Sequence, residues 1–409
     1  MMVMHNQTTS RGKLRLAILT LHPIHYQTAL WRRLAQEPDL DPEVWFCSDE
    51  GLDTADPVSG YGQAVSFGRP LLQGFRSRFW RNLPLTRNSS SFWCRVNPGI
   101  ITALGRGRYD ALFVHSYHNF TQLAAILVAR RLGTKVLVRS EPTLKLPVNA
   151  SRRSLKGILL PWLFGQVDAL MAIGALNREY YRHYGVSEAK IFLMPYAVDN
   201  AYFFQQREIW APQRERLKQE YGIAAPKVIL YVGRFQRRKR VLDLIQAFES
   251  LGLAGVSLVL VGTGETFEAC RRYVSNRHLT GVHLLGFRNQ AELPRLYAMG
   301  DVFVLPSEDE PWGLVINEAM CSGLPIVASE RVGAAADLVQ PGYNGFRFPP
   351  GDRPALAQAL RLALKDGAKE RMGQASLEII RGWGFEEDIV AVRQALGLAS
   401  RAGRRETTL

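Results

Sequence analysis

The chain has 409 residues, which is enough for two domains of ordinary size. A hydrophobic content of 47%, with 10% aromatic residues, excludes an intrinsically disordered chain and is typical of a packed globular protein. The net charge is +14, and residues 1–199 hold 24 Lys and Arg against 14 Asp and Glu. This excess favours an anionic partner such as a nucleotide, a phosphate-linked acceptor, an acidic lipid surface or nucleic acid. The four cysteines lack zinc-site spacing, so we expect reduced thiols in a cytoplasmic protein.

Alternating apolar and amphipathic segments predict a mainly parallel sheet in the first half, covered by helices on both faces. We expect strands at residues 14–20, 44–47, 111–114, 135–138, 169–173 and 191–194, and helices near 26–34 and 121–132. Ligands of such sheets bind just beyond the carboxyl ends of the strands. That position singles out His22, His25, His115 and residues 139–141, although each histidine could simply satisfy a nearby backbone group. His115 is the strongest candidate because its polar neighbours have no evident packing role.

Two basic and aromatic clusters, Trp31-Arg32-Arg33 and residues 76–81, occur in the first half. Such mixtures suit a membrane interface and also suit RNA. The alternative is an aromatic core with solvated arginines, and the sequence leaves this choice open. Residues 157–176 predict a helix and then a strand, because Pro161 and Asp168 interrupt any membrane span.

In the second half, a polar connection over residues 201–226 precedes a strand at 228–232. The loop after that strand holds five cations, at positions 234, 237, 238, 239 and 240, before a helix at 241–249. Guanidinium and ammonium groups near a helix amino end predict an anion site, although a solvated basic turn is the alternative. Further strands are expected at 257–261 and 282–285, and helices at 354–364 and 383–396. The Gly262-Thr263-Gly264 sequence is a weak signal for a nucleotide.

The most informative stretch is a strand–loop–helix–strand unit, with strands at 302–305 and 325–328 and a helix at 314–321. Its loop lies at the carboxyl end of a strand. Gly313 allows a backbone N–H to approach a ligand, and the helix start suits a phosphate. Glu310 and Glu318 are acceptors suited to the hydroxyls of a sugar or a ribose, although both could be solvated surface charges.

These features together resemble the retaining glycosyltransferases of family 4. The resemblance rests on Gly233, Arg234, Lys239, Gly286, Asp301, Pro306, Ser307, Glu310, Glu318, Gly323 and Pro325. It implies the α/β GT-B fold, with two Rossmann-like domains facing a central cleft. Residues 1–199 would form the acceptor-side domain, residues 200–380 the domain that binds the donor nucleotide, and residues 381–409 a helix returning to the first domain and a tail. It further implies a nucleotide-sugar co-substrate and no metal cofactor.

The resemblance also implies residue roles. Arg234 and Lys239 would neutralise the donor diphosphate, Glu310 would bind sugar hydroxyls, Glu318 the ribose, Phe287 the base, and His115 would face the transferred sugar. Backbone N–H groups of Trp312, Gly313, Leu314 and Val315 would approach the sugar and phosphate. This chain departs from the family at Arg240, at Tyr196-Ala197, at residues 22–25 and at Ala334, where glycine or Asn-Gly is common.

We therefore expect a hexosyltransferase that moves a sugar, with retention, to a glycan, lipid-linked or other glycoconjugate acceptor. It would be cytoplasmic, with peripheral contact to the anionic inner membrane surface as a further expectation. The first alternative is a degenerate, non-catalytic module that binds nucleotides or glycans. The second is a nucleic-acid-binding protein, which we do not expect because no nucleic-acid motif is present and the charge is spread.

Overall fold

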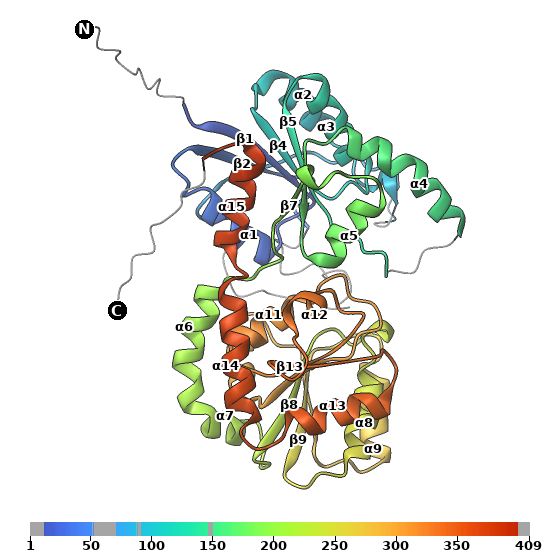
Figure 1. The fold of residues 1–409 in the computed structure, drawn as a ribbon, viewed down its shortest axis with the longest axis vertical. Helices are drawn as coiled ribbons and strands as arrows, with labels where there is room; N and C mark the ends of the chain where they lie inside the picture. The colour runs from blue at the N-terminus through green and yellow to red at the C-terminus, as the bar shows by residue number, and fades with distance from the viewer. Residues whose placement is uncertain are drawn as a thin grey trace, which may run out of the picture.

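The computed structural model describes residues 12–50, 52, 71–86, 88, 91–145 and 150–399. It contains two α/β domains stacked along the long axis of the molecule (Figure 1). In the first sheet the strand order is β3-β2-β1-β4-β5-β6-β7, and in the second it is β10-β9-β8-β11-β12-β13. Every strand pairing within the two sheets is parallel. The predicted fold class, two parallel-sheet α/β domains, is confirmed.

The elements of the first domain follow the predicted alternation. They are β1 (Leu14–Thr20), α1 (His25–Leu34), β2 (Leu40–Phe46), β3 (Arg76–Phe79), α2 (Pro98–Gly107), β4 (Ala111–His115), α3 (Phe120–Arg131), β5 (Lys135–Arg139), α4 (Ala150–Gly165), β6 (Ala169–Ala172), α5 (Ala175–His183) and β7 (Ile191–Leu193). The central strands are apolar along their whole length because helices bury both faces of the sheet.

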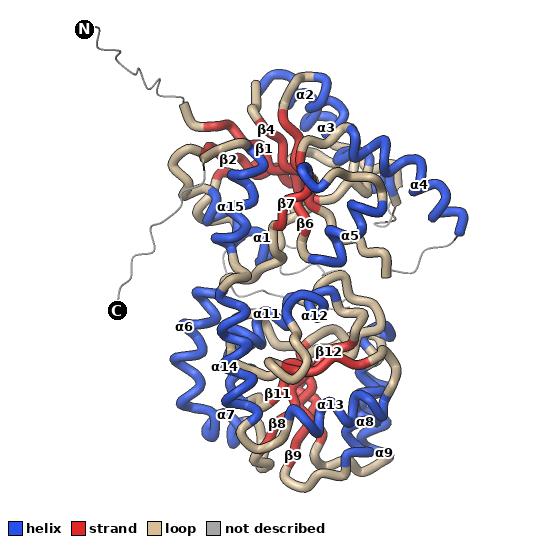
Figure 2. The backbone as a smooth tube through the Cα atoms, in the orientation of Figure 1, coloured by secondary structure: helices blue, strands red, loops and turns tan. Residues whose placement is uncertain are grey.

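The second domain begins with a helical connection. Its elements are α6 (Asn200–Trp210), α7 (Arg214–Glu220), β8 (Lys227–Val232), α8 (Val241–Leu251), β9 (Val256–Val261), α9 (Phe267–Asn276), β10 (Val282–Gly286), α10 (Leu293–Met299), β11 (Val302–Leu305), α11 (Leu314–Cys321), β12 (Ile326–Ser329), α12 (Gly333–Leu338), β13 (Gly345–Phe348), α13 (Arg353–Ala363), α14 (Ala368–Arg381) and α15 (Phe385–Leu396). Helices lie on both sides of the sheet (Figure 2). The polar composition of residues 201–226 did not predict α6 and α7, because α6 buries only Phe203.

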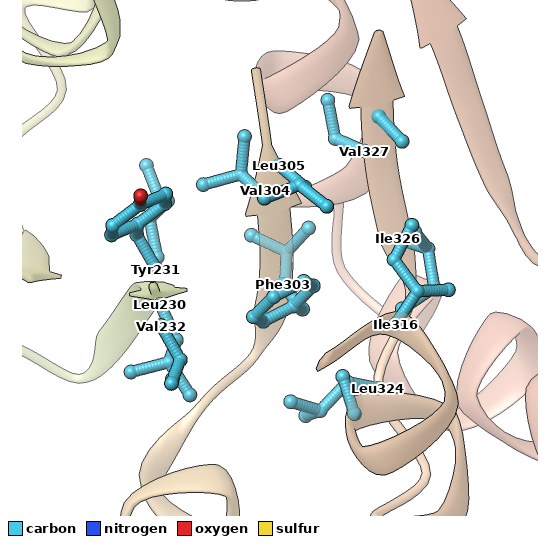
Figure 3. Packing of buried hydrophobic residues seen from close by; sticks show 14 of the residues in the cluster. Leu230, Tyr231, Val232, Phe303, Val304, Leu305, Ile316, Leu324, Ile326 and Val327 are labelled. Atoms are coloured by element: carbon cyan, nitrogen blue, oxygen red, sulfur yellow. The ribbon is translucent and has the colours of Figure 1, made fainter. Parts of the chain in front are cut away.

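The core of the second domain lies around the β8–β11–β12 strands. Figure 3 shows Tyr231, Phe303 and Ile326 from these three neighbouring strands, packed near Ile316 of α11. From β8 the chain adds β9 and β10 on one side of the sheet and then β11, β12 and β13 on the other. The strand order therefore reverses between β8 and β11. Ligands of open α/β sheets bind at such a reversal, beyond the carboxyl ends of the strands.

The last helix returns to the first domain. The side chains of Ile389 and Val392 lie in the core of that domain, and α15 packs against β7 and α1. Arg393 Nη1 lies 2.7 Å from Asp39 Oδ1, and Arg33 Nε lies 2.7 Å from Glu386 Oε1. These contacts tie α15 to the first domain, whereas α14 lies beside the second (Figure 1).

The two basic and aromatic clusters are built into the first domain. Trp31 is fully buried, so it cannot contact a membrane surface as its cluster suggested. The second cluster contains β3, an edge strand whose Arg76 and Arg78 pair with Asp41 and Glu43 of β2. Within the described residues, every helix is too short or too polar to be a membrane span.

Candidate functional site

A cavity of about 290 Å³ lies at the carboxyl ends of the second sheet, facing the first domain. Its wall contains eight residues that the sequence assigned to donor binding: Arg234, Lys239, Phe287, Glu310, Gly313, Leu314, Val315 and Glu318. They come from loops after β8, β10 and β11 and from α11, which are distant in sequence and meet at one edge of the sheet. The first domain contributes His25 and Tyr26.

Glu310 is the carboxylate at the centre of a cationic cluster. Its Oε2 forms an ion pair with Lys239 and accepts a hydrogen bond from Arg238 Nη1 at 3.3 Å. Arg238 Nη1 also donates to the Asp309 carbonyl at 2.7 Å. The side chains of Lys239 and Glu310 are only 10% and 12% exposed. Burial lowers the pKa of Lys239, and the Glu310 carboxylate opposes that shift.

Arg240 shows how the basic loop is shaped without the family's glycine. Its backbone has a φ of 52°, in the left-handed region that glycine favours. Its guanidinium Nε donates to Asp243 at 2.6 Å, and its Nη1 donates to Glu308 at 2.7 Å. The loop therefore keeps a glycine-like conformation, held by two ion pairs, and Lys239 still points into the cavity wall.

Glu318 is buried on α11, and both of its carboxylate oxygens have partners. Tyr297 donates its hydroxyl to Oε2 at 2.7 Å, and Gln290 Nε2 donates to Oε1 at 2.9 Å. Burial raises the pKa of Glu318 to about 7, although these two hydrogen bonds oppose the shift. The carboxyl group is thus fixed in position at the base of the cavity.

Glycines allow the loops around the cavity to approach closely. A Cβ at Gly262 would lie 1.9 Å from the Gly233 carbonyl oxygen, and the φ of Gly262 is 130°. A Cβ at Gly333 would lie 1.9 Å from the Pro311 carbonyl oxygen. The weak glycine signal after β9 therefore has a packing explanation, because backbone meets backbone there.

Trp312 does not line the cavity but supports its wall. Its side chain is 2% exposed and stacks on Trp383, with ring centroids 5.6 Å apart. Its indole N–H donates to Asn317 Oδ1 at 2.9 Å, and Asn317 Nδ2 donates to the Tyr196 carbonyl at 3.0 Å. The Trp312 side chain therefore fixes the loop before α11 against the segment that links the domains.

His115 is not in the cavity wall either. Its ring is buried, edge-on to Trp31 with centroids 4.8 Å apart, and its Nδ1 lies 3.4 Å from Gln27 Nε2. Its Nε2 has no hydrogen-bond partner among the described residues. Burial lowers the pKa of His115 well below its usual range, and the nearby Arg139 adds to this shift. The structure thus places a neutral imidazole behind Trp31, next to Ser116, which has a strained φ of 81°.

Sequence reasoning did not select Tyr26, which faces the cavity from the first domain. Its ring is edge-on to that of Tyr196, with centroids 5.4 Å apart. The Arg139 guanidinium carbon lies over the Tyr196 ring, 4.9 Å from its centroid. Burial raises the pKa of Tyr26 above its usual range, so its hydroxyl stays protonated. The signal that could have found it is the replacement of the family's glycine-rich loop by residues 22–25, immediately before it.

Arg288 and Gln290 are two further polar residues of the cavity wall, and Arg238, one of the five cations of the predicted anion site, also lies there. Arg288 Nη1 donates to the Phe287 carbonyl at 2.8 Å. The cavity wall therefore combines cations such as Lys239, the fixed carboxyl group of Glu318 and the aromatic ring of Phe287. Phosphate, ribose and base are the chemical groups that such a wall can accommodate.

Comparisons with known proteins agree with this geometry. Residues 213–378 match the family model "Glycosyl transferases group 1". The chain is 32% identical over 192 residues to an N-acetyl-alpha-D-glucosaminyl L-malate synthase of Bacillus anthracis, covering 46% of this chain and 50% of the relative. It is 27% identical over 335 residues to the sulfoquinovosyl transferase SQD2 of Arabidopsis thaliana, covering 79% of this chain and 61% of the relative. The chain thus spans about half to three-fifths of the length of these relatives.

Among solved structures, Anabaena Alr3699/HepE in complex with UDP and glucose superimposes with a TM-score of 0.70 at 17% identity, covering 94% of this chain and 100% of that one. The similarity extends over both domains. The comparisons therefore show that this chain has the GT-B fold and that residues 213–378, in its second domain, match the glycosyl transferases group 1 model.

Proposed function

We propose that this protein is a glycosyltransferase that moves a sugar from a nucleotide-sugar donor to a glycan, lipid-linked or other glycoconjugate acceptor. The observation that carries the proposal is that one cavity, at the point where the strand order of the second sheet reverses, is lined by Arg234, Lys239, Glu310 and Glu318. The relatives are named as sugar transferases or synthases, and the Anabaena neighbour was solved with UDP and glucose. UDP-sugars are therefore the first donors to test.

In the proposed reaction, the bond between the anomeric carbon and the phosphate oxygen breaks as the acceptor hydroxyl attacks that carbon. Lys239 and Arg234 stabilise the negative charge that develops on the departing diphosphate. Positioned cations can supply this stabilisation without a metal ion, so we propose a reaction that does not require one. The resemblance to family 4 favours retention, with the acceptor proton passing to the departing phosphate.

Donor binding requires a change of partners within the cavity. Lys239 is paired with Glu310 in this structure, and a diphosphate would take over the ammonium group. Glu310 would then be available to accept hydrogen bonds from sugar hydroxyls. His115, which lies behind Trp31, is proposed only as a positioning residue for the first domain's side of the cleft.

The experiment is a screen of nucleotide sugars by calorimetry and nucleotide release, using the wild type and Glu310→Gln. We expect Glu310→Gln to keep nucleoside diphosphate binding and to lose transfer, whereas the exposed Glu179→Gln serves as a matched control. A non-catalytic nucleotide- or glycan-binding module is the rival function. Donor binding without nucleotide release in any acceptor mixture would favour that rival, and unchanged transfer in Glu310→Gln would disprove the site assignment.

A further inference from the structure

Helix α4 carries large apolar side chains on its outward face. Leu155, Ile158, Leu159 and Trp162 are 56%, 74%, 50% and 52% exposed. Their spacing places them on one face of the helix, because residues three and four apart are neighbours on a helix surface. We call these four residues the α4 stripe. A surface helix ordinarily turns charged or polar residues to solvent, so the stripe calls for a partner.

The opposite face of α4 is already occupied. Leu160, Leu163 and Phe164 are buried in the core of the first domain, where Phe164 lies edge-on to Tyr117 with centroids 5.8 Å apart. The helix is therefore anchored by one apolar face and presents a second one outward. Figure 1 shows α4 extending away from the first domain, on the side opposite α15.

The charge of this region is complementary to an anionic surface. Residues 142–167 contain Lys145, Arg152, Arg153 and Lys156 but no Asp or Glu. Lys156 lies near enough to His118 to contribute to the lowered pKa of that imidazole, after the larger effect of burial. A tryptophan within an apolar stripe, next to cations, is the composition of helices that lie in the interface of an anionic membrane. A second copy of this chain would instead bring two sets of cations together, which is unfavourable.

A contact between the two domains precedes α4 in the chain. After β5, Lys145 reaches the second domain, where its Nζ donates to the Glu330 carbonyl at 3.0 Å and Arg331 donates to the Lys145 carbonyl. Lys145, which precedes α4 in the chain, therefore contacts the second domain through both its side chain and its carbonyl group.

We propose that the α4 stripe docks the protein on an anionic lipid surface, with Ile158 and Trp162 inserted among the lipids and the net positive charge of residues 142–167 favouring anionic headgroups. This surface differs from the two clusters that the sequence suggested, in which Trp31 is buried and Arg76 and Arg78 of β3 are paired with carboxylates of β2. The proposal goes beyond sugar transfer and does not rest on it. Only its extension to a lipid-linked acceptor, which would be held in the bound lipid surface, rests on the proposed function.

The test is co-sedimentation of the full chain with phosphatidylcholine vesicles, with and without phosphatidylglycerol, in the absence of any donor. The wild type should bind the anionic vesicles, less at high salt, and Ile158→Glu/Trp162→Glu should weaken binding by at least about tenfold. Val390→Glu, at a site on α15 that is 45% exposed, adds a charge to another helix and should bind as the wild type does. Equal binding by the stripe variant and the wild type would overturn the proposal.

Two further measurements keep the test independent of folding and of other occupants. Trp162→Phe should still bind, but its tryptophan emission should be quenched less by brominated lipids than that of the wild type. Light scattering should give the same molecular mass for the wild type and Ile158→Glu in solution. A wild type that associates, when Ile158→Glu does not, would assign the stripe to a second copy and overturn the proposal. Nucleotide release with a soluble acceptor should be unchanged in the stripe variants, so failure here is distinguishable from failure of the proposed transfer.

Discussion

Lys239 and Glu310 form an ion pair in the wall of the cavity, although they come from different loops and each has a proposed ligand of its own. Both side chains are about 90% buried, so neither charge is well solvated when its partner is removed. Removing one member of a buried pair typically destabilises a protein by about 3–5 kcal/mol. The unliganded site is therefore held together by the same two charges that the donor would separate.

We predict that Lys239→Ala abolishes transfer and weakens binding of a nucleoside diphosphate by at least about tenfold, because the cation proposed to contact the phosphates is lost. The variant should also lower the free energy of unfolding, with Arg238 limiting the loss by its contact with Glu310 at 3.3 Å. Chemical denaturation and calorimetry measure the two effects separately. Lys365→Ala, an exposed site on the same domain, is the control for loss of a lysine.

The double variant Lys239→Ala/Glu310→Gln tests whether the pair itself is the cause. If Glu310 is left with an unpaired charge in Lys239→Ala, neutralising it should restore part of the lost stability, by about 1 kcal/mol or more. A double variant whose loss equals the sum of the two single losses would show that the residues act independently. Neither outcome requires a substrate, so this prediction can be checked before the donor is known.

A second prediction concerns the pH dependence of stability. The pKa of Glu318 is raised to about 7 by burial, so the folded protein binds this proton more tightly than the unfolded chain does. Its stabilising contribution is fully present below the ordinary pKa of 4.5 and is lost as the pH rises from 4.5 to about 7. The loss should be on the order of 3 kcal/mol, since one pKa unit corresponds to about 1.4 kcal/mol.

Glu318→Gln should remove that dependence and should be more stable than the wild type at pH 8. The comparison is needed because burial also raises the pKa of Asp388 to about 8 and of Asp337 to about 6. These groups titrate in both proteins, so the difference between wild type and variant isolates Glu318. Free energies of unfolding at pH 5, 6, 7 and 8 measure it, and parallel curves for the two proteins would contradict the assignment.

A third prediction follows from the left-handed conformation of Arg240. Arg240→Gly removes about 1 kcal/mol of backbone strain but also removes ion pairs with Asp243 and Glu308 that are worth a similar amount. The net change in stability should therefore stay within about 1 kcal/mol. Arg240→Ile keeps the strain, worsens it by β-branching and loses both pairs, so it should destabilise clearly. Thermal unfolding compares the two, and equal losses would show that the backbone conformation is not limiting.

The sequence predicted the local secondary structure around the candidate site well. The strand–loop–helix unit was predicted with α11 at residues 314–321, as observed, because an apolar run, a glycine and a helical segment follow one another along the chain. Glu310 and Glu318 lie in that unit, so its local geometry brings both to the cavity. Arg234 and Lys239 join them because parallel strands end at one edge of the sheet.

The parts that were missed depend on contacts between distant segments. His115 lies at the end of a strand as predicted, but Trp31 from α1 lies against it, and no local pattern reports that packing. Tyr26 reaches the cavity only because the first domain faces the second. The exposed face of α4 was hidden in the sequence because its apolar residues on both sides have the composition of a buried helix.

The last prediction concerns the close approach of the loops after β8 and β9. Gly262→Ala would place a Cβ 1.9 Å from the Gly233 carbonyl oxygen, and its φ of 130° is one that L side chains rarely adopt. The loop that leads to Arg234 would have to move, so the variant should lose donor binding together with at least about 2 kcal/mol of stability.

Gly157→Ala is the matched control, because it lies inside helix α4 with open space around its Cβ position and should stabilise by roughly 0.5–1 kcal/mol. Calorimetry with a nucleoside diphosphate and thermal unfolding measure both variants. Normal donor binding by Gly262→Ala would mean that the contact between the two loops does not position the cations proposed to bind the diphosphate.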